Sequence, residues 1–367
     1  MSTIPFEHKL ENSFPHTLWE KRRVCLAISG GADSVALMRG MVAIAERYDM
    51  KERLICLTVD HRLRDAESAE DADFVMSLAA SLHVNARLLT ANVDEINERA
   101  KRLKSLECAA RDVRYNLLFS AAKTLGASYL LTAHHQDDQL ETMIFRLFRG
   151  VGFDGLVGVE RYRKIDDSLV LVRPMLGYSK KEILNYLANL KQEYREDSSN
   201  KSLVYSRNQV RNELVPVLNS IFPGKWQKAL LRLSTLSKEE SKYLEKQVDR
   251  LEEEISADRL RREKTNRYLL SIHAEDSTTR LIDSIDVATI PAEPLQKADL
   301  VILRRFFRRM WENRRWSTVA MGYDEWQRLA VAVKNQTPTQ QFPGNISLSF
   351  PQPDLVQLER KNERANQ

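Results

Sequence analysis

The segment Ser29-Gly30-Gly31-Ala32-Asp33-Ser34 has the residue types and spacing of a phosphate-binding turn. It follows an apolar run with strand character, residues 24–28, and precedes a helix-forming run, residues 34–48. A strand, a glycine turn and a helix in this order direct backbone N–H groups and a helix N-terminus toward an anion. Adjacent glycines let the backbone approach a phosphate closely, serine hydroxyls can donate to its oxygens, and Asp33 can hold a magnesium ion. The segment predicts a phosphate site with Asp33 as metal ligand; a capped tight turn is the structural alternative.

Two other polar segments follow predicted strands. Asp60-His61 follows the apolar run 53–59, and residues 134–139 follow the apolar run 129–133. Strands that alternate with helices at this spacing predict an α/β fold with a doubly wound parallel sheet. Ligands of such sheets bind where the carboxyl ends of the strands meet. We therefore expect the phosphate turn and both polar segments to form one site.

The polar segment after residue 133 contains acids that can recognise or deprotonate an amine. Asp138 and Glu141 are three residues apart, so on a helix they share a face, whereas Asp137 can instead cap the helix. His134 and His135 are ordinary loop residues in one interpretation and metal ligands, together with Asp137 or Asp138, in another. Because the only third ligands nearby are carboxylates, zinc is the weaker interpretation.

Composition sets broad limits on the function. The 367 residues leave room for two or three domains, and a net charge of +5 with a pI near 9.0 mildly favours anionic partners. No apolar run approaches the roughly 18 residues of a membrane span, and residues 1–14 lack the layout of a secretion signal, so we expect a cytoplasmic protein with no membrane contact. The three cysteines, Cys25, Cys56 and Cys108, form no C-x-x-C pair, so neither zinc nor an iron–sulfur cluster is expected.

The composition changes near residues 222–224, where we place a domain boundary. We expect a catalytic domain over residues 1–221, a mostly helical C-terminal domain that binds RNA over residues 222–335, and a short tail over residues 336–367, a reduced second C-terminal domain. A predicted helix at 299–316 carries an arginine cluster beside its apolar stripe, formed by Arg304, Arg305, Arg308, Arg309, Arg314 and Arg315. This cluster is either a solvated helix face or a contact for nucleic-acid phosphates.

Five motifs, taken together and in chain order, resemble those of the tRNA(Ile)-lysidine synthetases, which are N-type ATP pyrophosphatases of the PP-loop superfamily. The resemblance covers residues 20–220 and is loose beyond them. Each motif is weak alone, and the ordered set is specific. The motifs are Ser29 to Ser34; Asp60-His61-x-Leu63-Arg64; Ala110-Arg111-x-x-Arg114-Tyr115; His134-His135-x-Asp137-Asp138-Gln139-x-Glu141-Thr142; and Asp197-Ser-Ser-Asn200 with Tyr205-Ser-Arg207-Asn208-x-Val210-Arg211.

The resemblance implies a ligase that joins free L-lysine to C2 of cytidine 34 in an isoleucine tRNA with a CAU anticodon. ATP, with Mg²⁺, would adenylate the C2 oxygen, and the lysine ε-amine would displace AMP, which changes decoding from AUG to AUA. The oligomeric state stays open, with a homodimer as one option.

The resemblance also implies which residues act. ATP would be bound by Ser29, Gly30, Gly31, Ala32, Asp33 and Ser34, with Asp33 as the Mg²⁺ ligand. The residues expected to serve catalysis are Asp33, Arg111, Asp138, Glu141 and Arg207. Arg114 stays an alternative to Arg111, and Asp137 stays an alternative to Asp138.

Three rival interpretations make different demands on the sequence. A tRNA thiolase on the same scaffold requires catalytic or cluster cysteines. An amide-forming synthetase of the NAD or asparagine type usually carries a glutaminase domain, and no N-terminal nucleophilic cysteine is present. A non-catalytic RNA-binding protein would not need an intact phosphate turn with Asp33.

Overall fold

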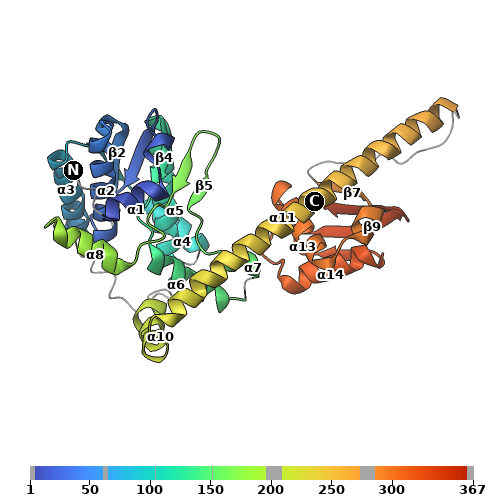
Figure 1. The fold of residues 1–367 in the computed structure, drawn as a ribbon. Helices are drawn as coiled ribbons and strands as arrows, with labels where there is room; N and C mark the ends of the chain where they lie inside the picture. The colour runs from blue at the N-terminus through green and yellow to red at the C-terminus, as the bar shows by residue number, and fades with distance from the viewer. Residues whose placement is uncertain are drawn as a thin grey trace. The chain divides into compact units, whose positions relative to one another are not determined.

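A computed structural model describes residues 5–60, 65–103, 105–150, 152–195, 209–272 and 286–361. The chain forms two compact units, Met1–Ser237 and Lys238–Gln367 (Figure 1). The division falls within helix α11, Lys225–Ile272, whereas the sequence analysis placed boundaries after residues 221 and 335. The functions assigned to these three parts remain predictions.

A six-stranded sheet organises the first unit, in the order β3-β2-β1-β4-β6-β5. Five strands run parallel: β1 Arg23–Ala27, β2 Leu54–Asp60, β3 Asn85–Thr90, β4 Ala127–Leu131 and β6 Val170–Val172. The edge strand β5, Tyr162–Lys164, pairs antiparallel with β6. The chain builds outward from β1 in both directions, so the strand order reverses between β1 and β4, where ligands of such sheets bind.

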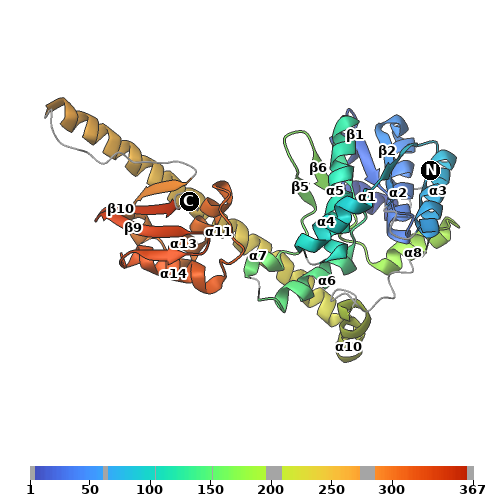
Figure 2. The same ribbon diagram turned by 180° about the vertical axis from the view of Figure 1, so that it is seen from behind.

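Helices cover both faces of this sheet, because successive strand residues point to opposite sides (Figures 1 and 2). Val24 and Leu26 pack in the core shared with α1 Pro5–Ser13, α2 Ala32–Arg47, α3 Asp65–Ser81 and α8 Lys180–Asn189. Cys25 instead packs in the core shared with α5, Leu106–Thr124, on the other face. The expected doubly wound α/β fold is confirmed.

Local signals explain several helix ends. Gly126, at φ +67°, lies just beyond α5, where a glycine in this conformation ends a helix. Residues 93–106 are polar and weakly patterned in the sequence, which suggests a loop or a flap, but they contain helix α4, Val93–Leu103. Its Ile96 is buried against α5 with Ala109 and Val113. The glycine-rich stretch 150–158 has the composition of a flexible loop, but it contains the short helix α7, Phe153–Leu156.

The last part of the first unit is helical and lies beside helix α6, Gln136–Leu147. A π-helical turn, Val210–Leu214, leads into α10, Val215–Ile221, and then into the start of α11. Leu140 and Ile144 of α6 pack with Trp226 of α11 and with apolar residues of the π-helical turn and α10. The packing places Arg211 of the π-helical turn close to α6.

The second unit is rich in helix, as expected, and also contains an antiparallel sheet in the order β7-β10-β9-β8. Its elements after α11 are β7 Val287–Pro291, α12 Ala292–Lys297, α13 Leu300–Asn313, α14 Tyr323–Lys334, β8 Gln340–Phe342, β9 Ile346–Gln352 and β10 Leu355–Arg360. The sequence pattern predicts one of these strands, β9, at residues 346–350. Because the strands of the predicted tail pair with β7, the tail belongs to the same unit as α13.

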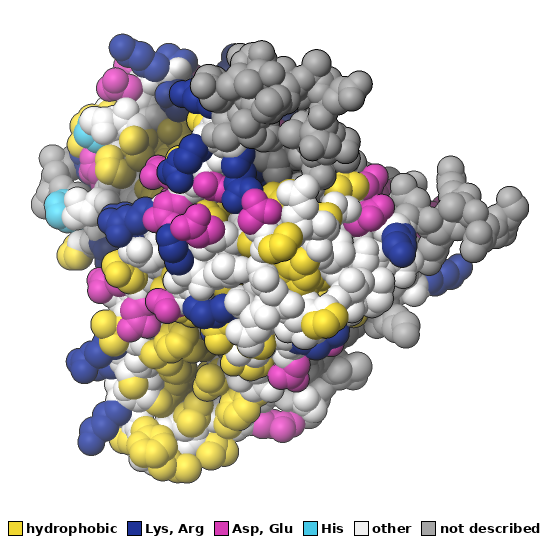
Figure 3. All heavy atoms as spheres, turned by 90° about the vertical axis from the view of Figure 1, so that its right-hand side faces the viewer, with side chains coloured by type: hydrophobic (Ala, Val, Ile, Leu, Met, Phe, Trp, Pro, Cys, Tyr) yellow, Lys and Arg dark blue, Asp and Glu magenta, His cyan; other side chains and the backbone are white. Residues whose placement is uncertain are grey.

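Two members of the arginine cluster on α13 form ion pairs with the acidic side of α11. Arg305 contacts Glu245 at 2.8 Å. Arg309 contacts Asp249 at 2.6 Å and Glu252 at 3.1 Å. Figure 3 shows basic side chains next to acidic ones on one face of the molecule. For Arg305 and Arg309 the structure therefore favours a role in packing the unit over contact with phosphates. Within the described ranges, no helix has the length and apolarity needed to cross a membrane.

Candidate active site

The candidate site lies where β1 and β4 end side by side in the sheet. Strand β1 leads into the phosphate turn, residues 29–34, and β4 leads into the polar segment that starts α6. His135 Nε2 lies 3.5 Å from Asp33 Oδ2, so the two segments meet as expected. Asp60 ends β2, and its predicted partner His61 lies outside the described residues.

The conformation of the phosphate turn is fixed by a glycine and by hydrogen bonds of Ser34. Gly30 has φ +86°, a conformation that other residues rarely adopt. Ser34 Oγ donates to Gly31 O at 2.9 Å and accepts from the Ser29 N–H at 3.2 Å. Gly31 precedes the first turn of α2, which begins at Ala32. Ser34 is thus engaged in shaping the turn, and the α2 N-terminus supplies the partial positive charge that suits a phosphate.

A second backbone segment supports the turn from outside. The Arg195 N–H donates to Gly30 O at 3.0 Å. The Arg195 guanidinium also binds Asp71 at 2.9 Å and Glu70 at 2.8 Å, both on α3. These contacts join residues 124 and 125 positions apart in the chain, which is why sequence reasoning missed Arg195.

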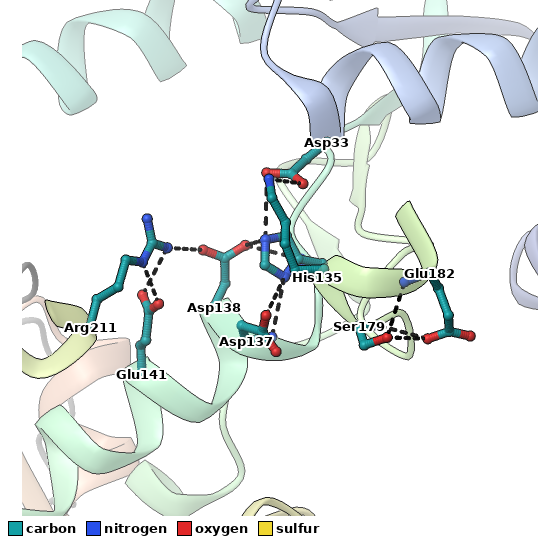
Figure 4. Close-up of polar contacts among 9 residues, drawn as sticks. Asp33, His135, Asp137, Asp138, Glu141, Ser179, Glu182 and Arg211 are labelled. Carbon is teal, nitrogen blue, oxygen red and sulfur yellow. Dashed lines mark hydrogen bonds and ion pairs between the residues drawn. The ribbon is translucent and has the colours of Figure 1, made fainter. Parts of the chain in front are cut away.

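Asp33, the one acid of the phosphate turn, is contacted by two cationic side chains. The Lys180 ammonium donates to Asp33 Oδ1 at 2.6 Å. His135 faces Asp33 Oδ2 (Figure 4). Burial raises the pKa of Asp33, but the hydrogen bond and charge of His135 and the charge of Lys180 outweigh it and lower the pKa. Asp33 is therefore held as a carboxylate, the form that a metal ion requires.

His135 organises the start of α6. Its N–H donates to Asp138 Oδ2 at 3.0 Å, and its Nδ1 accepts from the Asp137 N–H at 3.2 Å. In the neutral ring this leaves the proton on Nε2, which faces Asp33 at 3.5 Å and Asp138 at 3.7 Å. Burial lowers the pKa of His135, but the neighbouring carboxylates outweigh it and raise the pKa. His135 is thus a buried link between Asp33 and Asp138, more than an ordinary loop residue.

Glu141 and Asp138 share a face of α6, as predicted, and both lie next to Arg211. Arg211 Nε and Nη2 bind the two oxygens of Glu141 at 2.6 and 3.1 Å. Arg211 Nη2 also lies 3.7 Å from Asp138 Oδ1. Glu141 is only 3% exposed, whereas the side chain of Asp138 is 19% exposed. Asp138 is therefore the more accessible acid of the pair, and Arg211 neutralises the buried one.

Of the arginines predicted for the site, Arg111 and Arg114 lie within the described residues. Arg111 Nη2 donates to His134 Nε2 at 3.3 Å, and His134 Nδ1 lies 3.0 Å from Thr132 Oγ1, so Arg111 reaches the end of β4. Arg111 and Arg114 both lie over the ring of Tyr115. The choice between them stays a prediction. Arg207 and residues 197–200 lie outside the described residues.

The described residues fit a nucleotide with its magnesium ion better than a protein-bound metal. Among the parts of the chain that the structure describes, no group of three or more His, Cys, Asp and Glu could hold a metal. Magnesium that arrives with a nucleotide needs only one or two carboxylates, because phosphates and water complete its shell. Asp33, beside a glycine turn and a helix N-terminus, meets that need.

Comparisons with known proteins identify a matching family model and several similar relatives. Residues 3–218 match a family model described as a PP-loop domain. A tRNA(Ile)-lysidine synthase of Nostoc sp. is 28% identical over 351 residues, which make up 96% of this chain and 95% of that protein. Those of Borreliella burgdorferi and Porphyromonas gingivalis are 33% and 38% identical over 65% and 58% of this chain. The chain spans about half the length of these two relatives, 52% and 44%.

A solved structure is also similar. The U34-tRNA thiolase NcsA from Methanococcus maripaludis, with its [4Fe-4S] cluster, matches with a TM-score of 0.52 at 17% identity, over 64% of this chain and 78% of that one. At this identity the likeness supports the fold alone.

Proposed function

The chain belongs to the PP-loop domain family, and on that premise we propose that it is a tRNA(Ile)-lysidine synthase (synthetase). One observation carries the proposal: Asp33 of the phosphate turn contacts His135, and His135 contacts Asp138. Such a set of contacts can hold nucleotide phosphates at one end and an amine at the other. The name that the three relatives share supports this choice among PP-loop enzymes.

In the proposed reaction, the C2 oxygen of cytidine 34 in an isoleucine tRNA with a CAU anticodon attacks the α-phosphorus of ATP. Pyrophosphate leaves, and the C2 oxygen carries AMP. The ε-amine of free L-lysine then forms a bond to C2 and loses a proton, and the C2–O bond breaks as AMP departs. The product is lysidine, and the tRNA reads AUA in place of AUG.

The phosphate turn would hold the triphosphate. The backbone of Gly30 and Gly31 and the α2 N-terminus would contact its oxygens. Asp33 would bind Mg²⁺, which when bound neutralises charge that builds on the phosphates during transfer. Arg111 would add a guanidinium at the end of β4, and Arg207 is proposed for the same role.

Asp138 and Glu141 would divide the work on the lysine amine. Asp138, the more accessible carboxylate, would bind the ammonium and accept its proton. Glu141 would keep Arg211 and the start of the π-helical turn in place through its bidentate contact. This assignment favours Asp138 over Asp137, whose N–H completes the helix cap on His135.

The second unit is proposed to bind the tRNA body. Because Arg305 and Arg309 are engaged with α11, Arg308 is the better candidate on α13, since its side chain is 56% exposed. Replacing Arg308 with glutamate should then weaken tRNA binding and reduce its salt dependence. A homodimer and a cytoplasmic location are kept as proposals.

A thiolase makes demands that two of the three cysteines do not meet. Cys25 and Cys56 are buried in adjacent strands, and burial raises the pKa of each thiol to about 12. A thiol with so high a pKa is a poor nucleophile at neutral pH. Cys108 is exposed near the start of α5.

The proposed function is tested by incubating the purified protein with Mg·ATP, free lysine and an isoleucine tRNA transcript that carries a CAU anticodon. The nucleoside at position 34 should gain the mass of one lysine less one water, and only when ATP and lysine are both present. Asp33→Asn should abolish AMP formation while tRNA binding persists, whereas Asp73→Asn, on the exposed side of α3, should leave both intact. Full activity of Asp33→Asn would refute the assignment.

A further inference from the structure

Two lysines follow one another in the first turn of α8, and they lie differently. The Lys180 ammonium donates to Asp33 Oδ1 at 2.6 Å, across 147 residues of sequence. The next residue, Lys181, is exposed. The two side chains have the same chemistry and nearly the same place in the helix, so the contact with Asp33 is set by the direction of Lys180 alone.

The fold holds α8 in the position that brings Lys180 to the site. The Gln136 N–H, at the start of α6, donates to Tyr178 O at 2.9 Å. The Tyr178 hydroxyl donates to Phe6 O at 2.8 Å in the core. Ser179 then caps α8, with its hydroxyl and N–H both 2.8 Å from Glu182 Oε2. Lys180 is therefore presented by a fixed helix start, and only its own flexible stem can move.

A lysine in the first turn of a helix is electrostatically unfavourable, because the helix N-terminus already carries partial positive charge. Asp33 lies in the first turn of α2, and an ammonium group from the first turn of α8 contacts its carboxylate. A concentration of positive charge beside a glycine turn matches the several negative charges of a nucleotide triphosphate better than the single charge of Asp33.

Lys180 and a magnesium ion compete for Asp33. A magnesium ion binds carboxylate oxygen at about 2.0–2.1 Å, so an ion on Asp33 Oδ1 would lie within about 5 Å of an ammonium 2.6 Å from the same oxygen. Two cations at this separation repel one another. With a metal ion on Asp33, the Lys180 ammonium would therefore be better placed against phosphate oxygens, which its rotatable stem and three N–H donors allow.

We propose that Lys180 is a positioning residue with two alternative partners, the Asp33 carboxylate and the phosphates of the bound nucleotide. In the first arrangement its ammonium is the counter-ion of Asp33 and competes with the metal. In the second it binds phosphate oxygens and orients the triphosphate over the turn. The inference rests on the proposed function only in taking Mg·ATP as the ligand; it needs neither tRNA nor lysine.

The test uses the full-length protein and two binding measurements with opposite expected outcomes. Mn²⁺ alone, followed by electron paramagnetic resonance, reports competition for Asp33, and Lys180→Met should bind it about five-fold more tightly. Mg·ATP, followed by calorimetry, reports the phosphate contact, and the same variant should bind it about ten-fold more weakly. Lys181→Met is the matched control and should shift neither constant. Lys180→Arg, which keeps the charge, should recover most of the Mg·ATP affinity.

A purely structural role for Lys180 would not move the two affinities in opposite directions. The proposal is overturned if Lys180→Met leaves Mn²⁺ affinity unchanged or lowers it, or if Lys181→Met shifts both constants equally. If the methionine variant does not fold, Lys180→Gln is measured by the same criteria. If Lys180→Met shows the opposite shifts but the wild-type protein makes no lysidine, the proposed function is refuted and this inference stands.

Discussion

The ion pair between Glu141 and Arg211 should stabilise the α6 region well beyond what a surface pair provides. Arg211 Nε lies 2.6 Å from Glu141 Oε1, and the carboxylate is 3% exposed. Burial lowers the pKa of Arg211, but the hydrogen bond and charge of Glu141 outweigh it and raise the pKa. Replacing Arg211 removes the guanidinium that neutralises a buried charge, which is costly because the low-dielectric surroundings screen little.

The magnitude follows from the exposure of the two partners. Breaking a fully buried pair costs about 3–5 kcal/mol, whereas an exposed pair contributes about 0.2–1 kcal/mol. The Arg211 side chain is 39% exposed, so water screens part of the interaction, and we expect a coupling energy of about 1–2 kcal/mol. The single variants should also differ: Arg211→Met leaves the buried Glu141 carboxylate without its partner, whereas Glu141→Gln leaves an arginine side chain that is 39% exposed and still 3.7 Å from Asp138. Arg211→Met should therefore destabilise the region more.

A double-mutant cycle over Glu141→Gln and Arg211→Met measures the coupling. Native-state hydrogen exchange at the amides of α6 gives the opening free energy of each variant. The control cycle is Lys164 with Asp167, which are also 2.6 Å apart but 67% and 100% exposed. The shortest distance is matched, and the control pair is far more exposed. A coupling energy no larger than that of the control pair would refute the reasoning that burial gives the Glu141–Arg211 pair its strength.

Three further outcomes are expected. The neighbouring carboxylates outweigh burial and raise the pKa of His135. The stabilising effect of His135 is therefore complete below the ordinary pKa near 6.5 and declines as pH rises through the raised value. In urea titrations, the stability lost in His135→Asn should be larger at pH 6 than at pH 8.5. In the native protein, one thiol, that of Cys108, should react fast with a disulfide reagent, because Cys25 and Cys56 are buried with pKa values near 12. In the denatured protein, all three thiols should react. A fast reaction that persists in native Cys108→Ser would contradict this. Arg309→Met should destabilise the second unit by about 1–2 kcal/mol through loss of its contacts with Asp249 and Glu252. Arg308→Met should have little effect. Equal effects of the two variants in thermal unfolding would count against the packing role of Arg309.

The sequence was most informative where local pattern and local chemistry agree. Apolar runs located β1, β2 and β4. Ser179 and Glu182 mark the start of α8 in the sequence, because the capping box is a contact between near neighbours. The phosphate turn was recognisable since its glycines and serines act within six residues. Strand β5 was missed because its three residues are exposed and carry no apolar signal. Helix α4 was left unassigned because Ile96 is the only residue of it that is buried.

Contacts between distant residues could not be obtained in this way. Lys180 and Lys181 are identical in type, and only the rotation of α8 against the sheet decides which one reaches Asp33. Arg211 was part of a recognised motif, but its partner depends on the π-helical turn and on the packing around Trp226. The arginine cluster on α13 left two interpretations open, because the acids that bind Arg305 and Arg309 lie about 60 residues away on α11.

A geometric rule of parallel sheets nevertheless predicts where such residues converge. In a parallel sheet, every helix that follows a strand begins near the carboxyl edge, so its first turn lies close to the ligand site. Here α2 follows β1, α6 follows β4 and α8 follows β6. The charged residues of those first turns include Asp33, Asp138 and Lys180, which are the residues that converge. Helix starts can be located from N-cap residues. Charged residues in the first turns of such helices are therefore candidate site residues, as those of the glycine turn are, and this includes lysines that the helix dipole disfavours there.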